Sequence, residues 1–340
     1  MKTISLNGPG SIEIIEQDVD NTFEQMVLLK VISSGVCAAD SYLWTGNHPW
    51  KISYPIVPGH EIFGQVVDTK SPKDYPVGSK VVVQVNVPCY SCELCLNDKF
   101  NMCVERRHFG STYKGSFAEY ISIPVGARIH CFKEAIDDQV GGLSETMANA
   151  IYCASRANLN GSERILILGM GSIGACLAHY LRITYPSMKI AALTSSSAKR
   201  DKLIELEMIP MSLEDSSKFQ DSFDVVFETS GYSESFKAGL NSLKPTGLAV
   251  IYGVFQKEMM FDFNQVSEFK ELTLIGGHLA DDNSFDLSVK FLSDQQNELG
   301  YLISNIVGFN NFSSAFSDLK FKQYKTLFQP RILSEVINGI

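Results

Sequence analysis

A glycine-rich turn between an apolar run and a helix-like segment is the feature that most restricts the fold of this 340-residue chain. Gly169, Gly171 and Gly174 directly follow the apolar run. A G-x-G-x-x-G pattern is weak alone, but between a strand and a helix it is typical of a dinucleotide-binding turn. Gly169 would make the turn, Gly171 would let the backbone approach a pyrophosphate, and Gly174 would pack helix on strand. We predict that Ser172 and Ile173 join the three glycines in binding a cofactor at the helix start.

From about residue 150 onward, strand-like and helix-like segments alternate. Strands are predicted at 165–168, 189–193, 223–228, 248–252 and 272–275. Helices are predicted from the glycine turn to 182, at 198–207 and at 233–243. This alternation predicts an α/β fold with a doubly wound parallel sheet, as in a Rossmann domain.

The first 145 residues are organised differently, because short β-like runs lie between Gly and Pro turns. Examples of these runs are 26–32, 62–67, 80–87 and 117–123. They predict a compact, mainly antiparallel unit. A chain of this length also favours two domains. We therefore place a mainly β domain at 1–148 and a Rossmann domain at 149–284. Residues 285–340, helical at 285–293 and apolar-rich at 331–337, are expected to return to the first domain.

Four closely spaced cysteines are the strongest metal signal in the chain. They form a C-x2-C-x2-C-x7-C pattern made of Cys89, Cys92, Cys95 and Cys103. Four thiolates can surround Zn²⁺ as a tetrahedron, and their close spacing lowers the entropy cost of closing the loop. Such a closed shell leaves no position for a substrate, so this zinc is predicted to be structural.

A second metal site is predicted from separated residues: Cys37, His60, Glu61 and Glu145. A thiolate, an imidazole and a carboxylate can hold zinc and leave one position for water or substrate. Each residue also has an ordinary structural interpretation, as a small core residue, a turn histidine or a carboxylate at a helix start. The prediction rests on their occurrence beside the four-cysteine loop and the glycine turn.

The segment after the second predicted Rossmann strand bears on which cofactor binds. An acidic residue about 20 positions after the glycines would bond the adenosine ribose hydroxyls of NAD. Here Thr194, Ser195 and Ser196 stand at that point, and Lys199 and Arg200 follow. Hydroxyls and cations suit a 2′-phosphate, which a carboxylate would repel. We therefore predict that NADP(H) is preferred over NAD(H), although serines here can also cap the next helix.

Composition excludes several other classes of protein. The net charge is −9 and no cluster of Lys and Arg stands out, which argues against nucleic-acid binding. The apolar uncharged run 165–181 is shorter than the roughly 20 residues of a membrane span and contains three glycines. The beginning of the chain does not look like a secretory signal, so we expect a cytoplasmic protein. In that compartment the eight cysteines would be thiols or metal ligands.

Taken together, these motifs resemble the zinc-containing medium-chain dehydrogenase/reductase superfamily along essentially the whole chain. The resemblance is carried by residues 35–40 (GVCAAD), 58–61 (PGHE), the four-cysteine loop, 115–120 (GSFAEY) and the glycine turn. It implies a GroES-like catalytic domain, a Rossmann domain, an active site between them, two zinc ions per chain and a homodimer or homotetramer. It also implies that Cys37 and His60 bind the catalytic zinc, while Glu61 or Glu145 completes the shell.

The resemblance to subfamilies is mixed. Glu145 is similar to the arrangement in the sorbitol and threonine dehydrogenase branches, and Ser195–Ser197 resembles the 2′-phosphate site of cinnamyl-alcohol-type reductases. Many relatives have Ser or Thr at the position where this chain has Ala39. The alanine in this chain resembles the corresponding residue of ribulose-phosphate reductases. Tyr42, Ser41 or a zinc-bound water could replace that hydroxyl in moving a proton, and we favour Tyr42.

The predicted reaction follows from this chemistry. Zinc would polarise the substrate oxygen, and the nicotinamide would exchange a hydride with the substrate carbon. The expected substrate is a secondary alcohol or ketone of a polyol, sugar or cyclitol. A sugar-phosphate ketone and an aldehyde are the alternatives. A protein that binds zinc and cofactor without catalysis is the alternative of another class.

Overall fold

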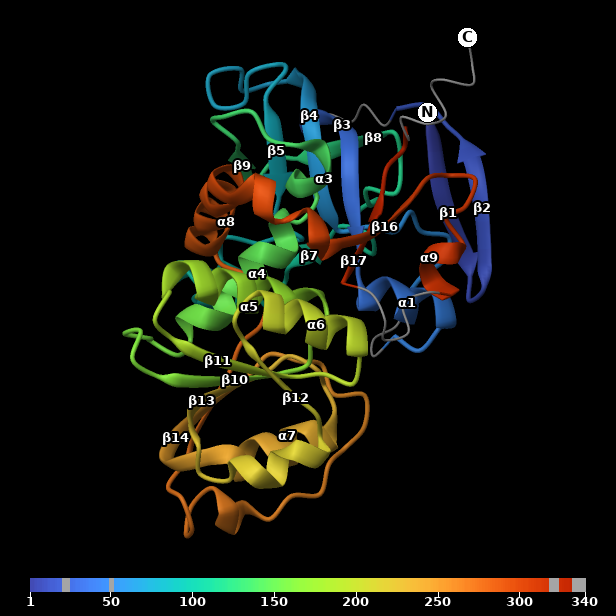
Figure 1. Ribbon diagram of the computed structural model, residues 1–340. Helices are drawn as coiled ribbons and strands as arrows, with labels where there is room; N and C mark the ends of the chain where they lie inside the picture. Colours follow the sequence, from blue (N-terminus) through green and yellow to red (C-terminus); the bar gives the residue numbers. More distant parts are fainter. Residues whose placement is uncertain (20–24, 49–51, 318–323, 332–340) are drawn as a thin grey trace. The chain divides into compact units, whose positions relative to one another are not determined.

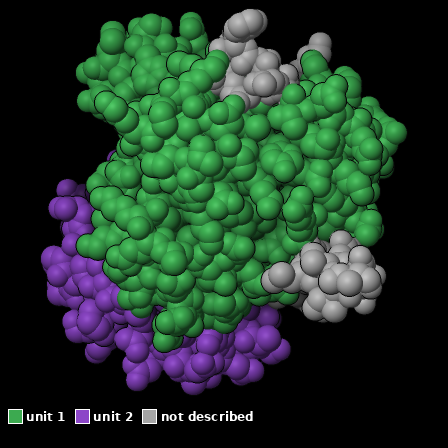
Figure 2. Space-filling model, turned by 90° about the horizontal axis from the view of Figure 1, so that it is seen from above, with its two compact units in different colours: residues 1–148, 281–340 green, residues 149–280 purple. Residues whose placement is uncertain are grey.

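The computed structural model describes residues 1–19, 25–48, 52–317 and 324–331. The chain divides into two compact units, coloured separately in Figure 2. Unit 1 comprises residues 1–148 and 281–340, and unit 2 comprises residues 149–280. The chain thus leaves unit 1 within helix α4 (Ser144–Ser155) and returns at Asp281, slightly before the predicted residue 285. The predicted apolar stretch 331–337 lies, from 332 onward, outside the described residues.

Unit 2 contains the predicted parallel sheet. In its described residues, six strands are ordered β12-β11-β10-β13-β14-β15, and every neighbouring pair is parallel. The strands are β10 (Arg164–Leu168), β11 (Lys189–Leu193), β12 (Ile209–Met211), β13 (Phe223–Glu228), β14 (Leu243–Ile251) and β15 (Thr273–Gly276). The helices are α5 (Ser172–Thr184), α6 (Ser197–Glu205) and α7 (Ser233–Ser242). The doubly wound α/β prediction is therefore confirmed.

Burial explains why unit 2 adopts this arrangement. The central strand β10 has four consecutive apolar residues, 165–168, that are at most 1% exposed. Continuous apolar strands are typical of sheets that are covered on both faces. Figure 1 shows α5 and α6 over one face and α7 over the other. The carboxyl ends of the strands therefore form one edge at which loops can bind a ligand.

Unit 1 is built around a mainly antiparallel sheet. Its described strands are ordered β16-β17-β3-β4-β5-β9, and β8 also pairs with β3. They are β3 (Gln25–Val36), β4 (Glu61–Thr69), β5 (Lys80–Val83), β8 (Tyr120–Pro124), β9 (Ile129–Cys131), β16 (Ile303–Val307) and β17 (Lys325–Phe328). Two smaller pairs are β1 (Lys2–Gly8) with β2 (Ser11–Glu16), and β6 (Asn86–Val87) with β7 (Arg107–His108). The mainly β prediction for this part is confirmed.

Short helices and turns complete the two units. The remaining α-helices are α1 (Ala38–Thr45), α2 (Glu93–Leu96), α3 (Asp138–Gly141), α8 (Asp282–Gln295) and α9 (Ser314–Ser317). The 3₁₀ helices are Phe100–Met102, Glu214–Phe219, Phe263–Gln265, Gln296–Glu298 and Gly300–Leu302. Within the part of the chain that the structure describes, no helix has both the length and the apolar character to cross a membrane.

The strands differ from the sequence prediction at several places. The run 80–87 is two strands, because β5 pairs with β4 and β9 whereas β6 pairs with β7. Strand β12 was not predicted because Pro210 interrupts it, and proline is tolerated since β12 lies at an edge. Strands β16 and β17 were not predicted either, and they join the sheet of unit 1 through β3.

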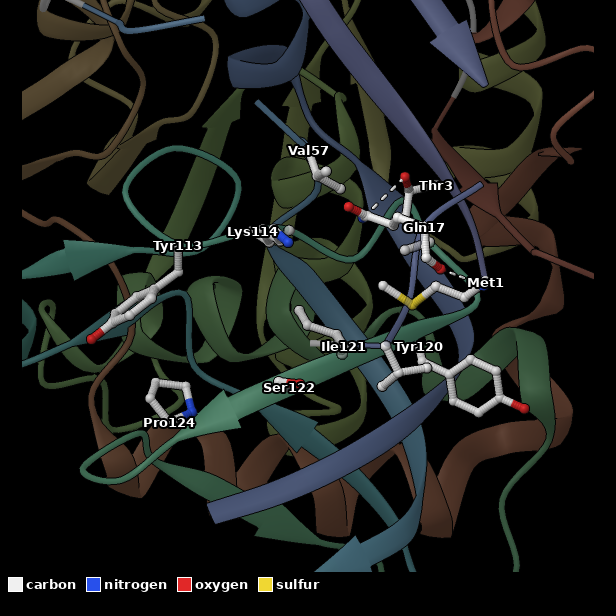
Figure 3. A pocket seen from close by; sticks show the side chains of 13 residues that line it. Met1, Thr3, Gln17, Val57, Tyr113, Lys114, Tyr120, Ile121, Ser122 and Pro124 are labelled. Atoms are coloured by element: carbon white, nitrogen blue, oxygen red, sulfur yellow. Dashed lines mark hydrogen bonds between the residues drawn. The ribbon is translucent and has the colours of Figure 1, made fainter. Parts of the chain in front are cut away.

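A cavity of about 170 Å³ opens in unit 1 beside β1 and β8 (Figure 3). Its lining includes Met1, Gln17, Lys114 and Tyr120. The Gln17 side-chain amide donates to the Thr3 hydroxyl at 3.3 Å in its wall. Its described lining residues include none of the predicted metal ligands, so this cavity is separate from the predicted metal sites.

Candidate metal and cofactor sites

The four cysteines of the loop come together in unit 1. Their sulfur atoms all lie within 4.8 Å of one another. The Sγ atoms of Cys89 and Cys95 are 3.9 Å apart, and those of Cys92 and Cys103 are also 3.9 Å apart. Four sulfurs bound to zinc at about 2.3 Å in a tetrahedron would be about 3.8 Å apart. The donor set and its spacing therefore fit a structural zinc ion.

Hydrogen bonds prepare part of this cluster for metal binding. The Cys89 amide donates to Cys103 Sγ and the Cys92 amide donates to Cys89 Sγ, each at 3.3 Å. Hydrogen bonding to Ser91 lowers the pKa of Cys89 to about 6, whereas burial raises the pKa of Cys95 to about 12. Because thiolates are the form that binds metal, a cation is needed to hold all four sulfurs deprotonated.

A second group joins residues from two neighbouring strands. The ligand atoms of Cys37, His60 and Glu61 lie within 4.8 Å of one another, and this is the second such group among the described residues. Cys37 follows β3 and is the N-cap of α1, while Glu61 is the first residue of β4. The pairing of Gly35 with Glu61 in the β3–β4 ladder brings these two strand ends together.

Asp40 orients the histidine of this group. Its Oδ1 lies 3.5 Å from His60 Nδ1, and its Oδ2 accepts a hydrogen bond from the Cys37 amide at 2.9 Å. Burial lowers the pKa of His60, but Asp40 and Cys37 outweigh burial, and the pKa lies well above its usual value. The contact occupies Nδ1 and leaves Nε2 for a metal, as in many carboxylate–histidine–metal arrangements.

The backbone turn before His60 is held by the GSFAEY segment. The Ser116 amide donates to the Gly59 carbonyl at 3.0 Å, and the Phe117 amide donates to the Pro58 carbonyl at 3.1 Å. Gly59 has a φ of +97°, a conformation that favours glycine. A Cβ at Gly115 would lie 2.3 Å from the Gly59 carbonyl oxygen, so both glycines are needed for this close approach.

A buried ion pair holds Glu61. Lys325 of β17 donates to Glu61 Oε1, and the Thr146 hydroxyl donates to Oε2 at 3.0 Å. Glu61 and Lys325 are each 3% exposed. A Cβ at Gly35 would lie 2.0 Å from Glu61 Oε2, so this glycine makes room for the carboxylate. Neither Lys325 nor Thr146 was identified from the sequence.

Lys325 also lies within electrostatic reach of Glu145. Burial alone would lower the pKa of Lys325, but Glu61, Cys37 and Glu145 raise it to about 12. Glu145 is buried in the first turn of α4. Buried acidic groups need positive partners, and Lys325 supplies one. A divalent cation bound at this group would supply further positive charge.

The residues considered for proton transfer lie on helix α1. Tyr42 is half-buried, five positions after Cys37. The Ser41 hydroxyl donates to the Ala38 carbonyl at 2.6 Å, so its proton is used within the helix. Ala39 offers no hydroxyl. Tyr42 as the proton-transfer residue stays a prediction.

The glycine turn of unit 2 lies between β10 and α5. Gly169 has a φ of +94°, and a Cβ there would lie 2.6 Å from Ser230 Cβ. A Cβ at Gly174 would lie 2.0 Å from the Gly169 carbonyl oxygen, whereas one at Gly171 would meet nothing within 4 Å. Gly171 is exposed and is the N-cap of α5, so the backbone there is open to a ligand, with Ser172 and Ile173 in the first turn.

A loop after β13 supports this turn and was not identified from the sequence. The Thr229 hydroxyl lies 2.9 Å from the Gly169 carbonyl oxygen, to which it donates. Glu228 is fully buried, and its Oε1 accepts hydrogen bonds from the amides of Ser230 and Gly231, each at 2.8 Å. Burial raises the pKa of Glu228. The sequence offered only an acidic residue at a strand end, which many strands have.

The hydroxyl-rich segment leads from β11 into α6. Ser195 is exposed, and Ser196 is the N-cap of α6 but makes no side-chain capping hydrogen bond. Lys199 is 5% exposed, its Nζ donates to the Met170 carbonyl at 2.6 Å, and burial lowers its pKa to about 8. Arg200 Nε lies 3.4 Å from the carbonyl oxygen of Thr194. The segment therefore places an amine against the glycine turn.

Comparison with known families agrees with the division of the chain into two units. Residues 24–133 match the alcohol dehydrogenase GroES-like domain, and residues 173–294 match the zinc-binding dehydrogenase family. The first match contains Cys37, His60, Glu61 and the four-cysteine loop. The second begins at the start of α5.

Individual proteins are similar over most of their length. The chain is 28% identical over 295 residues to L-galactonate-5-dehydrogenase of Escherichia coli (strain K12). The aligned region covers 84% of this chain and 85% of that protein. It is 27% identical over 305 residues to erythritol/L-threitol dehydrogenase of Mycolicibacterium smegmatis, covering 82% and 83%. A Sinorhizobium meliloti protein solved with NADP bound has a TM-score of 0.89 at 22% identity, covering 97% and 99%.

Proposed function

The chain belongs to the zinc-type alcohol dehydrogenases, and on that premise we propose that it moves a hydride between a nicotinamide cofactor and a secondary alcohol or ketone. The observation that carries this proposal is the Cys37–His60–Glu61 group, which occurs in the same unit as the four-cysteine cluster. When bound there, zinc supplies Lewis-acid polarisation of a substrate oxygen. We propose two zinc ions per chain, one in each group.

We propose Glu145 rather than Glu61 as the third protein ligand of the catalytic zinc. Both oxygens of Glu61 already accept hydrogen bonds, from Lys325 and from Thr146. Coordination by Glu61 would compete with a buried ion pair, and breaking such a pair is costly. Glu145 is not in the group whose ligand atoms lie within 4.8 Å of one another, but it interacts electrostatically with the same Lys325 ammonium group, so its side chain would turn toward the metal. In this arrangement Asp40 orients His60, and Lys325 donates to Glu61 close to the ligands.

The proposed substrate is a polyol, a sugar or a cyclitol. The proteins named for L-galactonate and for erythritol/L-threitol, to which the chain is similar, support this class. The test is zinc per chain together with NADPH and NADH turnover on polyols and ketoses, ketose phosphates and aldehydes. We expect two zinc ions and the highest kcat/KM with a neutral polyol–ketose pair. If the protein prefers a phosphorylated ketose or an aldehyde, that compound class takes the place of the polyol proposal. One zinc ion per chain without turnover would favour a non-catalytic binding protein.

NADP(H) is the proposed cofactor, and Lys199 makes its binding pH-dependent. Burial lowers the pKa of this lysine to about 8, so it is charged below that pH and neutral above it. We expect NADPH to bind more tightly than NADH at pH 7, and this advantage to fall about tenfold by pH 9.5, as one charge-assisted contact is lost. Titration of both cofactors by fluorescence measures the ratio of their dissociation constants.

Two variants on the same helix make this test specific. Lys199→Met should flatten the pH dependence, whereas Lys202→Met, which removes the half-buried partner of the exposed Glu205, should keep it. A ratio that does not change with pH in the unmodified protein would contradict the role of Lys199. Tighter NADH binding at every pH would overturn the proposed NADP(H) preference.

A homodimer or homotetramer is proposed from the surface of unit 2. Strand β15 is at an edge of the described sheet, and the segment before it exposes large apolar side chains. Met260 is 92% exposed, Phe263 69% and Phe269 59%. Exposed apolar residues next to an open sheet edge are typical of an association surface.

A cytoplasmic location is also proposed, supported by eight cysteines that are all free thiols.

A further inference from the structure

A hydrogen bond in unit 2 joins two side chains that have no role in the function described so far. The Tyr252 hydroxyl donates to Asn149 Oδ1 at 2.6 Å. Asn149 is 5% exposed on α4, and Tyr252 directly follows β14 at the carboxyl edge of the sheet. A short bond to a buried amide at a ligand-binding edge of an α/β sheet calls for a functional explanation.

The strand order indicates which part of a dinucleotide would reach this pair. The hydroxyl-rich segment follows β11, and the glycine turn follows the neighbouring strand β10. With the adenosine at the first and the pyrophosphate at the second, the other half of the cofactor continues over β13 and β14. Strands lie about 4.8 Å apart, so the end of β14 is roughly 10 Å beyond that of β10. Tyr252 therefore lies where the nicotinamide half would end.

The tyrosine ring is held on two sides. A Cβ at Gly277 would lie 2.6 Å from the Tyr252 ring, so the ring packs directly on that glycine. The ring of Tyr152 packs against it edge-on, with centroids 6.5 Å apart. The Tyr252 amide donates to the Glu228 carbonyl at 2.9 Å, which fixes the backbone. The hydroxyl group therefore has one defined position, from which it can fix the Asn149 amide.

Helix α4 carries both Asn149 and Glu145, the proposed metal ligand. Asn149 is four positions after Glu145 on α4, and residues four apart lie on the same face of a helix. We propose that the Asn149 amide hydrogen-bonds the carboxamide of the nicotinamide, and that Tyr252 is a positioning residue that acts through Asn149. The proposal rests on the proposed function, because it assumes that unit 2 binds a nicotinamide cofactor.

Binding measurements on the full chain test this assignment without turnover. We compare NADPH with 2′-phospho-ADP-ribose, which lacks the nicotinamide ring, in Tyr252→Phe and Asn149→Ala variants. Each substitution should weaken NADPH binding about fivefold to tenfold, the effect of one hydrogen bond, and leave the ADP-ribose ligand unaffected. Tyr185→Phe, at the far end of α5 from the glycine turn, is the matched control and should change neither affinity.

The double variant separates positioning from direct contact. If Tyr252 acts through Asn149, adding Tyr252→Phe to Asn149→Ala should cost little further NADPH affinity. Equal losses for both ligands, or no loss for either, would overturn the assignment. If the selective loss is found in a protein that oxidises no alcohol, the proposed reaction fails while the nicotinamide contact stands. If the protein oxidises an alcohol but the variants show no selective loss of NADPH affinity, the proposed reaction stands and the proposed nicotinamide contact is rejected.

Discussion

Cys37→Ala is expected to leave one zinc ion per chain instead of two and to lower kcat/KM by about a thousandfold or more. The substitution removes the only sulfur of the group formed with His60 and Glu61. Metal polarisation of a substrate oxygen stabilises the transition state by several kcal/mol, which corresponds to this factor in rate. Atomic emission measures the zinc, and initial rates with the best substrate measure the activity.

Cys131→Ala is the matched control for this experiment. Cys131 is a half-buried free thiol on β9, and its Sγ lies 3.7 Å from the Asp74 carbonyl, outside both metal groups. The control should keep two zinc ions and full activity. Two zinc ions and normal turnover in Cys37→Ala would reject Cys37 as a ligand. Loss of both ions would mean that the four-cysteine cluster depends on this site.

Lys325→Met is expected to destabilise unit 1 by about 3–5 kcal/mol, because it leaves the Glu61 carboxylate buried without its cation. For a unit of this size the midpoint of thermal unfolding should fall by roughly 10 °C. The lysine is stabilised in its charged form, with a pKa raised to about 12. Its contribution is therefore complete below the unfolded value near 10.4 and is lost only as the pH rises through about 12. The difference between the two proteins should accordingly be the same at pH 6 and pH 9.

A second substitution distinguishes the ion pair from packing. Adding Glu61→Gln to Lys325→Met removes the unpaired charge, and the double variant should recover much of the lost stability. Lys270→Met removes a buried lysine of unit 2 that donates to the Asn241 and Leu243 carbonyls and pairs with the exposed Asp221 at 2.7 Å. It controls for loss of a buried ammonium group whose carboxylate partner remains in contact with water. Full stability of Lys325→Met would show that the pair contributes nothing.

Local patterns explain which parts of the molecule could be predicted from the sequence. The glycine turn and the four-cysteine loop each have all their residues in one short segment, so spacing alone predicted their geometry. The parallel sheet was predictable because its strands are continuous apolar runs between helices. Strand β12 was not predicted because a proline such as Pro210 argues against a strand. At a sheet edge, however, the missing amide donor is tolerated.

Contacts between distant residues explain what could not be predicted. Lys325 is 264 positions from Glu61, and no spacing rule connects them. Thr146 and Asp40 were visible beside predicted ligands, but a hydroxyl or a carboxylate near a motif does not reveal what it contacts. The pairing of Tyr252 with Asn149 likewise depends on how β14 ends beside α4. Only the three-dimensional structure identifies these contacts.

The late position of β17 in the chain has a consequence for how the protein is made. Strand β17 pairs with β3 at residues 34–36, next to Cys37, and it carries the lysine that neutralises Glu61. A growing polypeptide emerges from the ribosome N-terminus first, so all of unit 2 is synthesised before this strand exists. The four cysteines lie within fifteen residues and can capture their ion early. The proposed structural site can therefore be complete before unit 2 is synthesised, whereas the proposed catalytic site is complete only after β17 is made.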